Sequence, residues 1–127
     1  MHRSRLVAAL VDVPAEHFAV ETGFWEGALG RSHEADTADP DPDYADFGEV
    51  IPGFQFYVQR VGAPARVHLD IETDDVEAEV LRLEALGATR VEQIKNWWVM
   101  QDPAGLLFCV VRVPVPDAFE RDAVTWD

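Results

Sequence analysis

Cysteine, basic residues and long apolar runs are scarce in this chain of 127 residues. The single cysteine, Cys109, excludes an intrachain disulfide and fits a reducing compartment. Ten basic residues stand against 24 acidic ones, and the formal net charge of −14 makes nucleic acid and anionic membranes poor partners. The apolar run from Leu6 to Val11 is too short for a signal-peptide core or a membrane span. These scarcities predict a cytoplasmic protein that binds neither nucleic acid nor membrane.

The abundant acidic residues allow two interpretations. They can attract a cationic ligand, or they can simply keep the protein soluble, which is the commoner role. Residues 34–46 place several of these charges between prolines and have the composition of a surface loop. A calcium-binding loop is the alternative there, but the segment lacks the glycine and the distal glutamate of an EF-hand loop.

The chain carries an internal repeat. Residues 53–61 and 105–113 both read Gly-x-x-Phe-x-Val-x-Arg-Val, with five matches in nine positions. A second sequence similarity precedes each copy. Gly30 and Gly87 each follow a helical pattern, at the point where a residue in the left-handed conformation would end the helix. An apolar fraction of 48% is ample for a single core. We therefore predict one domain, residues 1–113, with two similar modules, 5–62 and 66–113, and a tail, 114–127.

Hydrophobic periodicity places the individual elements. One helix is predicted to end at Gly30, and Thr73 or Asp74 can cap a second helix. Predicted strands cover residues 5–11, 44–50, 54–61, 66–72, 89–94, 97–101 and 106–113. In the tail, Phe119 and Trp126 can attach the chain end to its own domain or to a second copy.

The strand at residues 66–72 alternates strictly and places His68, Asp70 and Glu72 on one face. Neighbours on one face lie about 7 Å apart by strand rise, so His68 and Asp70 are expected beyond direct hydrogen bonding unless their side chains lean together. His68 can be a hydrogen-bonded structural histidine, a ligand contact or a catalytic base. Cys109, with apolar neighbours, is interpreted as a small buried hydrophobic residue.

Several short motifs, in a fixed order, carry a family resemblance. They are Phe24-Trp25-x-x-x-Leu29-Gly30, His68-x-Asp70-x-x-x-Asp74-Asp75, Glu84-Ala85-Leu86-Gly87-Ala88, Asp102-Pro103-x-Gly105 and Phe108-Cys109. With the element order, they resemble the vicinal oxygen chelate superfamily of glyoxalase I, extradiol dioxygenases and bleomycin-resistance proteins, and within it the glyoxalase-like domains common in actinobacteria. The resemblance covers residues 5–113. It implies an α+β fold of two βαβββ modules whose curved sheets enclose a cleft, and a homodimer, with the cleft formed within one chain or across two.

The resemblance also implies where a metal would bind. Metal-binding members take one His or Glu from the first strand and one Glu from the last strand of each module. The corresponding positions here are Leu6 to Ala8, Tyr57, His68 and Cys109, so only His68 is a family-type ligand. Gln59 would add a neutral oxygen but no carboxylate base, and such a shell is incomplete for a hard or borderline divalent ion. We therefore predict no cofactor, with a divalent metal ion as the alternative.

Without a metal, the predicted site is a cleft for a small organic molecule. Its predicted ligand-binding residues are Gln55, Tyr57, Gln59, His68, Asp70, Trp97, Trp98, Leu107 and Cys109. Only one of the two tryptophans can face the cleft, because neighbours on a strand point to opposite sides. The aromatic, amide, phenol and carboxylate groups suit a planar or cationic ligand. The chain is thus predicted to bind and sequester a small molecule, with no catalytic residue assigned.

Two other functions stay open. One is a metal-dependent lyase or dioxygenase of the glyoxalase type, using His68 with donors such as Gln59 or Glu72. The other is a non-catalytic scaffold or regulatory partner of another enzyme. Bound metal would distinguish the first from simple ligand binding, and a co-purifying macromolecule would favour the second.

Overall fold

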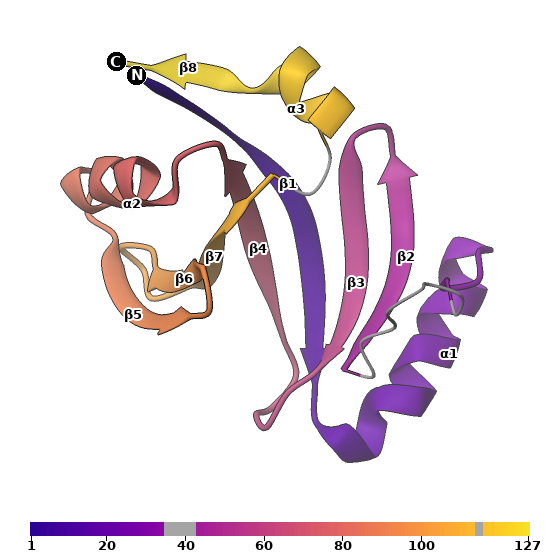
Figure 1. Cartoon of the computed structure of the whole chain (residues 1–127). Helices are drawn as coiled ribbons and strands as arrows, with labels where there is room; N and C mark the ends of the chain where they lie inside the picture. Colours follow the sequence, from indigo (N-terminus) through magenta and orange to yellow (C-terminus); the bar gives the residue numbers. More distant parts are fainter. Residues whose placement is uncertain (35–42, 114–115) are drawn as a thin grey trace. The chain divides into compact units, whose positions relative to one another are not determined.

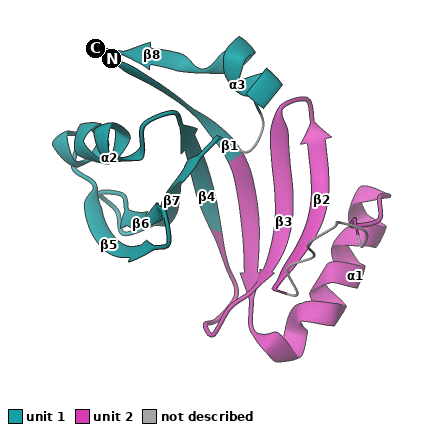
Figure 2. Cartoon of the chain, in the orientation of Figure 1, with its two compact units in different colours: residues 1–7, 68–127 teal, residues 8–67 magenta. Residues whose placement is uncertain are grey.

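The computed structural model describes residues 1–34, 43–113 and 116–127. The chain forms two compact units: unit 1 contains residues 1–7 and 68–127, and unit 2 contains residues 8–67 (Figure 2). Strand β1 (His2–Val13) supplies its first half to unit 1 and its second half to unit 2.

Unit 2 is a three-stranded sheet with a helix beside it (Figure 1). β2 (Tyr44–Ile51) pairs antiparallel with β3 (Phe54–Arg60), and β3 pairs parallel with the second half of β1. Between β1 and β2 lie a short 3-10 helix, η1 (Ala15–His17), and α1 (Phe18–Leu29). The helix ends where the sequence predicts, because Gly30 adopts the left-handed conformation with φ 66°.

Alternation along the strands builds the core of unit 2. Phe18 and Trp25 of α1 pack against a buried cluster of four residues. That cluster consists of Val13, Ala45, Phe47 and Val58. Phe56 and Val58 face this core from β3, so the intervening Gln55, Tyr57 and Gln59 face away from it.

Unit 1 contains the second module. The sheet order is β4 (Arg66–Thr73), β7 (Leu107–Arg112), β6 (Trp97–Gln101) and β5 (Thr89–Ile94). β4 and β7 are parallel, whereas the β7–β6 and β6–β5 pairs are antiparallel. α2 (Val76–Ala85) packs on one face, and the buried cluster there consists of Val80, Met100, Phe108 and Val110. Along the chain, these elements follow the βαβββ order predicted for the module.

The cap of α2 differs from the prediction. The Asp75 carboxylate accepts a hydrogen bond from the Ala78 N–H at 3.0 Å and so caps the helix. The two predicted caps bind β1 instead. Thr73 Oγ1 donates to the Arg3 carbonyl at 2.8 Å, and the Asp74 carboxylate accepts from the Arg3 N–H at 2.8 Å. The sequence prediction was therefore wrong by one residue, because those side chains serve a contact distant in sequence.

The tail is part of unit 1. It forms α3 (Pro116–Asp122) and β8 (Val124–Trp126), and β8 pairs antiparallel with the first residues of β1. Phe119 is buried. The Trp126 indole N–H donates to Ser4 Oγ at 2.8 Å, and the Arg82 guanidinium lies 3.8 Å from the centre of the Trp126 ring. Of the two attachments that the sequence left open, these contacts favour attachment to the chain's own domain.

A buried carboxylate lies close to these contacts. Glu79 on α2 is fully buried, and its two oxygens accept hydrogen bonds from Arg82 at 2.6 Å and 3.0 Å. His2 Nε2 lies 3.0 Å from Glu79 Oε1. Burial by itself raises the pKa of Glu79, but hydrogen bonds from Arg82, Ser4 and His2 outweigh it and leave this pKa below its usual value.

In the first module, the described part of the chain contains the two strands that the sequence predicts after the helix. Two strands follow α1, where a βαβββ module has three, and Glu34 forms only an isolated bridge with Asp46. Most of the predicted acidic loop, residues 35–42, lies outside the described residues. Among the helices that the structure describes, none is both long and apolar enough to cross a membrane.

Candidate functional site

Three chemically reactive side chains gather on one face of the unit 1 sheet. His68 and Asp70 alternate along β4, and Cys109 of β7 is the register partner of Asp70. One ligand atom from each of the three residues lies within 4.8 Å of the other two. The strand period of two and the parallel pairing of β4 with β7 therefore create a cluster of nitrogen, oxygen and sulfur donors, which we call the His68 cluster.

His68 and Asp70 lean toward each other. Their Nε2 and Oδ1 atoms are 3.5 Å apart, about half the spacing expected from strand rise alone. This is the exception that the sequence analysis left open, in which the side chains lean together, although Asp70 Oδ1 accepts no hydrogen bond within the described chain. His68 is buried and Asp70 is mostly buried, with its side chain 17% exposed, so the interaction is partly shielded from water.

One oxygen of this pair lacks a hydrogen bond. Asp70 Oδ1 is buried and has no hydrogen-bond partner among the described residues. A buried carboxylate oxygen without a donor is costly, and such atoms are uncommon in folded proteins. The cluster thus contains an acceptor that faces His68 Nε2 at 3.5 Å but accepts no hydrogen bond within the described chain, so a hydrogen-bond donor or a cation could complete it.

Glu72 does not join the cluster, although the sequence suggested it as an alternative metal donor. It is fully buried on β4, and its Oε1 accepts a hydrogen bond from Arg5 Nε at 2.6 Å. This contact pairs two charged groups inside unit 1. The suggestion of Glu72 as a donor beside His68 is therefore wrong, because its charge is already compensated by Arg5.

Cys109 is a free thiol that is only partly buried. Its neighbours Phe108 and Val110 belong to the apolar cluster under α2, so the alternation of β7 turns Cys109 to the opposite face, beside His68 and Asp70. The interpretation of Cys109 as a buried hydrophobic residue is therefore wrong. The apolar flanking residues suggested burial, whereas the family resemblance had already assigned Cys109 to the predicted cleft, and its polar neighbours come from β4.

The two tryptophans lie on opposite faces of β6. Trp98 packs against the apolar cluster under α2, and the Arg90 guanidinium lies 4.8 Å from its ring centre. Trp97 takes the other face, which it shares with Val99, the register partner of Cys109. Leu107 also occupies the face of Cys109, two residues earlier on β7. Of the predicted ligand-binding residues in unit 1, Trp98 alone lies away from the cluster face.

The three predicted ligand-binding residues of unit 2 form their own group. Gln55, Tyr57 and Gln59 share the face of β3 that is turned away from the core. Gln59 Nε2 donates to the Tyr44 hydroxyl at 2.9 Å, and the Tyr57 and Tyr44 rings meet edge to face at 6.2 Å. This group is therefore an ordered polar surface of unit 2.

The His68 cluster contains a donor set that fits a borderline divalent ion. Imidazole nitrogen, carboxylate oxygen and thiolate sulfur are the ligands that zinc takes in proteins, and three protein ligands leave a position for a substrate or water. Asp70 is the carboxylate that the family positions did not predict. The spacing His68-x-Asp70 was the available signal, since it puts an imidazole and a carboxylate on one face.

Comparison with solved structures shows which fold this is. The methylmalonyl-CoA epimerase from Mycobacterium tuberculosis is 14% identical, with a TM-score of 0.60 over 89% of this chain and 91% of that chain. The Mn(II)-bound glyoxalase from Novosphingobium aromaticivorans is 16% identical, with a TM-score of 0.55 over 91% of this chain and 43% of that chain. The fold is therefore that of the vicinal oxygen chelate superfamily, and the predicted α+β class is confirmed.

The sequence itself matches one family across most of its length. Residues 8–111 match the family described as "Glyoxalase-like domain", and the chain belongs to that family. No curated protein matches the sequence. At the identities given above, the solved structures establish the fold alone, so the chemistry of this chain has to be argued from its own residues.

Proposed function

We propose that the protein binds a small organic molecule at the His68 cluster, and that the ligand carries a positive charge or a strong hydrogen-bond donor. The observation that carries this proposal is the buried Asp70 Oδ1 without a hydrogen bond among the described residues. A donor or cation placed there would satisfy the oxygen, and hydrogen bonds to a charged group contribute about 1.5–3 kcal/mol.

The surroundings favour the same class of ligand. The net charge of −14 attracts cations and repels anions before any contact forms. Trp97, on the cluster face, supplies an aromatic surface against which a planar cation can stack. Its ring already has Lys95 Nζ at 6.0 Å from the centre, so a ligand stacked there would displace a flexible ammonium group.

Benzamidine and benzoate form a matched pair of probes for this proposal. Both are planar and similar in size, and they carry opposite charges. We expect calorimetry on chelator-treated protein to detect benzamidine but not benzoate. The Asp70→Asn variant should weaken benzamidine binding at least about tenfold, because it removes the acceptor charge. Equal binding of both probes, or full affinity in Asp70→Asn, would contradict the proposal.

Asp117→Asn is the matched control. Asp117 is an exposed residue of α3 that lines no part of the cluster, and its substitution changes the net charge by the same amount. It should leave benzamidine affinity within about twofold of the wild type, because a distant exposed charge is largely screened by salt. An equal loss in both variants would mean that benzamidine responds only to overall charge.

A second candidate function is metal-dependent chemistry at the same residues, as in a lyase or dioxygenase of the glyoxalase type. The observation that favours it is the set of three different donors within 4.8 Å. His68, Asp70 and Cys109 would hold a zinc-like ion, which would supply a Lewis acid beside any ligand on this face.

Titration of chelator-stripped protein with Zn²⁺ separates the two candidates. Stoichiometric binding that is lost in both His68→Ala and Cys109→Ser favours the metal-dependent function and calls for glyoxalase and dioxygenase assays. Benzamidine binding without stoichiometric Zn²⁺ binding favours the metal-free function. A thermal unfolding curve for each variant verifies that the fold is intact.

We also propose that the protein forms a homodimer, which the family resemblance implies. The exposed face of α1 supports this, since Val20 and Phe24 are 77% and 61% exposed. Apolar side chains exposed to this extent on one helix are typical of a protein–protein contact. Light scattering should give twice the chain mass, and Phe24→Glu should give the monomer. A monomeric wild type would contradict the dimer.

A further inference from the structure

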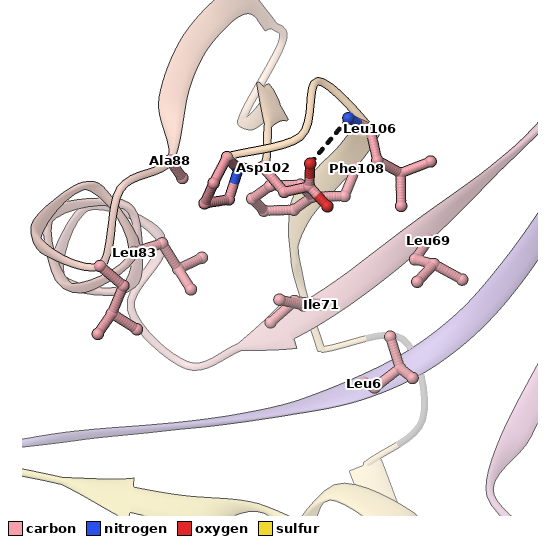
Figure 3. A pocket seen from close by; sticks show the side chains of 10 residues that line it. Leu6, Leu69, Ile71, Leu83, Ala88, Asp102, Leu106 and Phe108 are labelled. Carbon is pink, nitrogen blue, oxygen red and sulfur yellow. Dashed lines mark hydrogen bonds between the residues drawn. The ribbon is translucent and has the colours of Figure 1, made fainter.

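An apolar cavity of about 250 Å³ lies in unit 1 on the helix-covered face of the sheet (Figure 3). Leu69 and Ile71 of β4, Leu83 of α2 and Phe108 of β7 form its walls. Because side chains alternate along a strand, this is the face opposite to the His68 cluster. The cavity therefore shares strands with the cluster but is chemically and spatially separate from it.

The cavity is lined by residues of β1, β4, α2 and β7 and of the turns that follow α2 and β6. Three leucines form its rim and stay exposed: Leu86 by 68%, Leu6 by 48% and Leu106 by 44%. Gly87, with φ 110°, brings the end of α2 against Pro103, whose Cγ would lie 3.4 Å from a Cβ at position 87. The turn after α2 therefore packs closely against the Asp102–Gly105 turn at this edge of the cavity.

The cavity contains one charged side chain, and that side chain is already satisfied. Asp102 Oδ1 accepts hydrogen bonds from the Leu106 N–H at 2.8 Å and from the Ala104 N–H at 3.0 Å (Figure 3). These bonds fix the turn and leave the carboxylate committed to backbone donors. The lining therefore favours a ligand without charge or hydrogen-bonding groups.

We propose that this cavity binds a small uncharged aromatic or aliphatic hydrocarbon group. A cavity of about 150 Å³ lined by leucine, isoleucine and phenylalanine is enough to bind benzene, so 250 Å³ accommodates a ring with substituents. Water gains little there, since it needs two to four polar partners. Burying the ligand and the exposed leucine rim supplies the driving force.

A small molecule fits better than a second copy of the chain. The space is a pocket with walls on the strand, helix and turn sides, whereas a partner helix needs an elongated groove. The occupant argued here is therefore a free small molecule.

Fluorobenzene is a suitable probe because its binding can be followed by ¹⁹F NMR on the full chain. We expect binding with a dissociation constant of about 1 mM or lower, given its seven heavy atoms. Ala88→Leu places a larger side chain at a lining position and should weaken binding at least about tenfold. Ala85→Leu, the same substitution at an exposed position of α2 outside the cavity, should leave binding unchanged.

A second matched pair keeps the test valid if Ala88→Leu fails to fold. Leu86→Gln at the rim should weaken fluorobenzene binding, while Leu81→Gln on the exposed surface of α2 should not. Asp70→Asn should bind fluorobenzene like the wild type, which separates this cavity from the His68 cluster. Absence of binding by the wild type, equal binding by Leu86→Gln and wild type, or loss in Asp70→Asn would overturn the proposal. So would a change from dimer to monomer in Leu86→Gln, since a second copy would then occupy the cavity.

Discussion

His68 Nε2 and Asp70 Oδ1 approach to 3.5 Å on one face of β4, although the two residues are separated by a full strand repeat. The approach gathers a nitrogen and an oxygen donor on one side of the sheet, where Cys109 adds sulfur. Asp70 Oδ1 nevertheless has no hydrogen bond within the described chain. A polar group that folding leaves unsatisfied is a candidate for ligand binding rather than a contribution to stability.

Acid should weaken the fold through Glu79. The pKa of Glu79 in the folded protein is lower than its usual value of 4.5. Its ionised form therefore stabilises the fold fully at a pH above 4.5, and this stabilisation is lost as the pH falls through the folded pKa. Urea unfolding at pH 7 and at progressively lower pH should show a smaller acid-dependent loss in Glu79→Gln than in the wild type. Glu92→Gln, at an exposed position, should retain the wild-type acid dependence.

Removing the Trp126 side chain should detach the tail. Trp126→Ala loses both the hydrogen bond to Ser4 and the contact with the Arg82 guanidinium, and should lower the free energy of unfolding by about 2 kcal/mol. Val124→Ala, at a half-exposed position of the same strand, should change it by less than about 0.5 kcal/mol. Chemical denaturation measures both. Equal effects would mean that the Trp126 contacts do not anchor the tail.

Gly87→Ala should be destabilising because position 87 combines a φ of 110° with Pro103 Cγ at 3.4 Å from the added Cβ. The expected loss is about 1–2 kcal/mol in the free energy of unfolding. Gly62→Ala is the control, since nothing lies within 4 Å of its Cβ and its φ is not in the left-handed range. A neutral Gly87→Ala variant would mean that the turn after α2 relaxes readily.

Arg5 should matter for stability because it compensates the buried Glu72. Arg5→Met removes the guanidinium whose Nε lies 2.6 Å from Glu72 Oε1, and should cost about 3 kcal/mol in unfolding free energy. The double variant Arg5→Met/Glu72→Gln should recover part of that loss, since it no longer buries a charge. Thermal and urea unfolding would measure the recovery. No recovery would mean that Glu72 is not the group that Arg5 compensates.

Local patterns predicted much of the fold. The alternation at residues 66–72 gave the face shared by His68 and Asp70, and Gly30 ended α1 through its left-handed conformation. Local capping rules failed at Thr73 and Asp74, because both side chains bind Arg3, which lies seventy or more residues away in sequence. Short-range patterns do not contain such contacts.

The candidate site was harder to predict because it depends on the pairing of β4 with β7. The neighbours of Cys109 in sequence suggested a core residue, whereas the family resemblance assigned it to the cleft; its register with Asp70 places the thiol in the polar cluster. The apolar cavity was not predicted either. It lies between α2, the Asp102 turn and the sheet, and hydrophobic periodicity does not report whether packed elements leave a space between them.

The most direct test of the account is NMR mapping of benzamidine on ¹⁵N-labelled, chelator-treated protein. The account predicts that the largest amide shifts occur at Asp70 and Cys109, and that they disappear in Asp70→Asn. Amides at Ala88 and Leu106, which line the apolar cavity, should move little. Shifts concentrated at Ala88 and Leu106 would contradict the claim that the His68 cluster is the binding site. So would the absence of any shift at Asp70 and Cys109 up to about 10 mM benzamidine, which corresponds to a binding free energy weaker than about 3 kcal/mol.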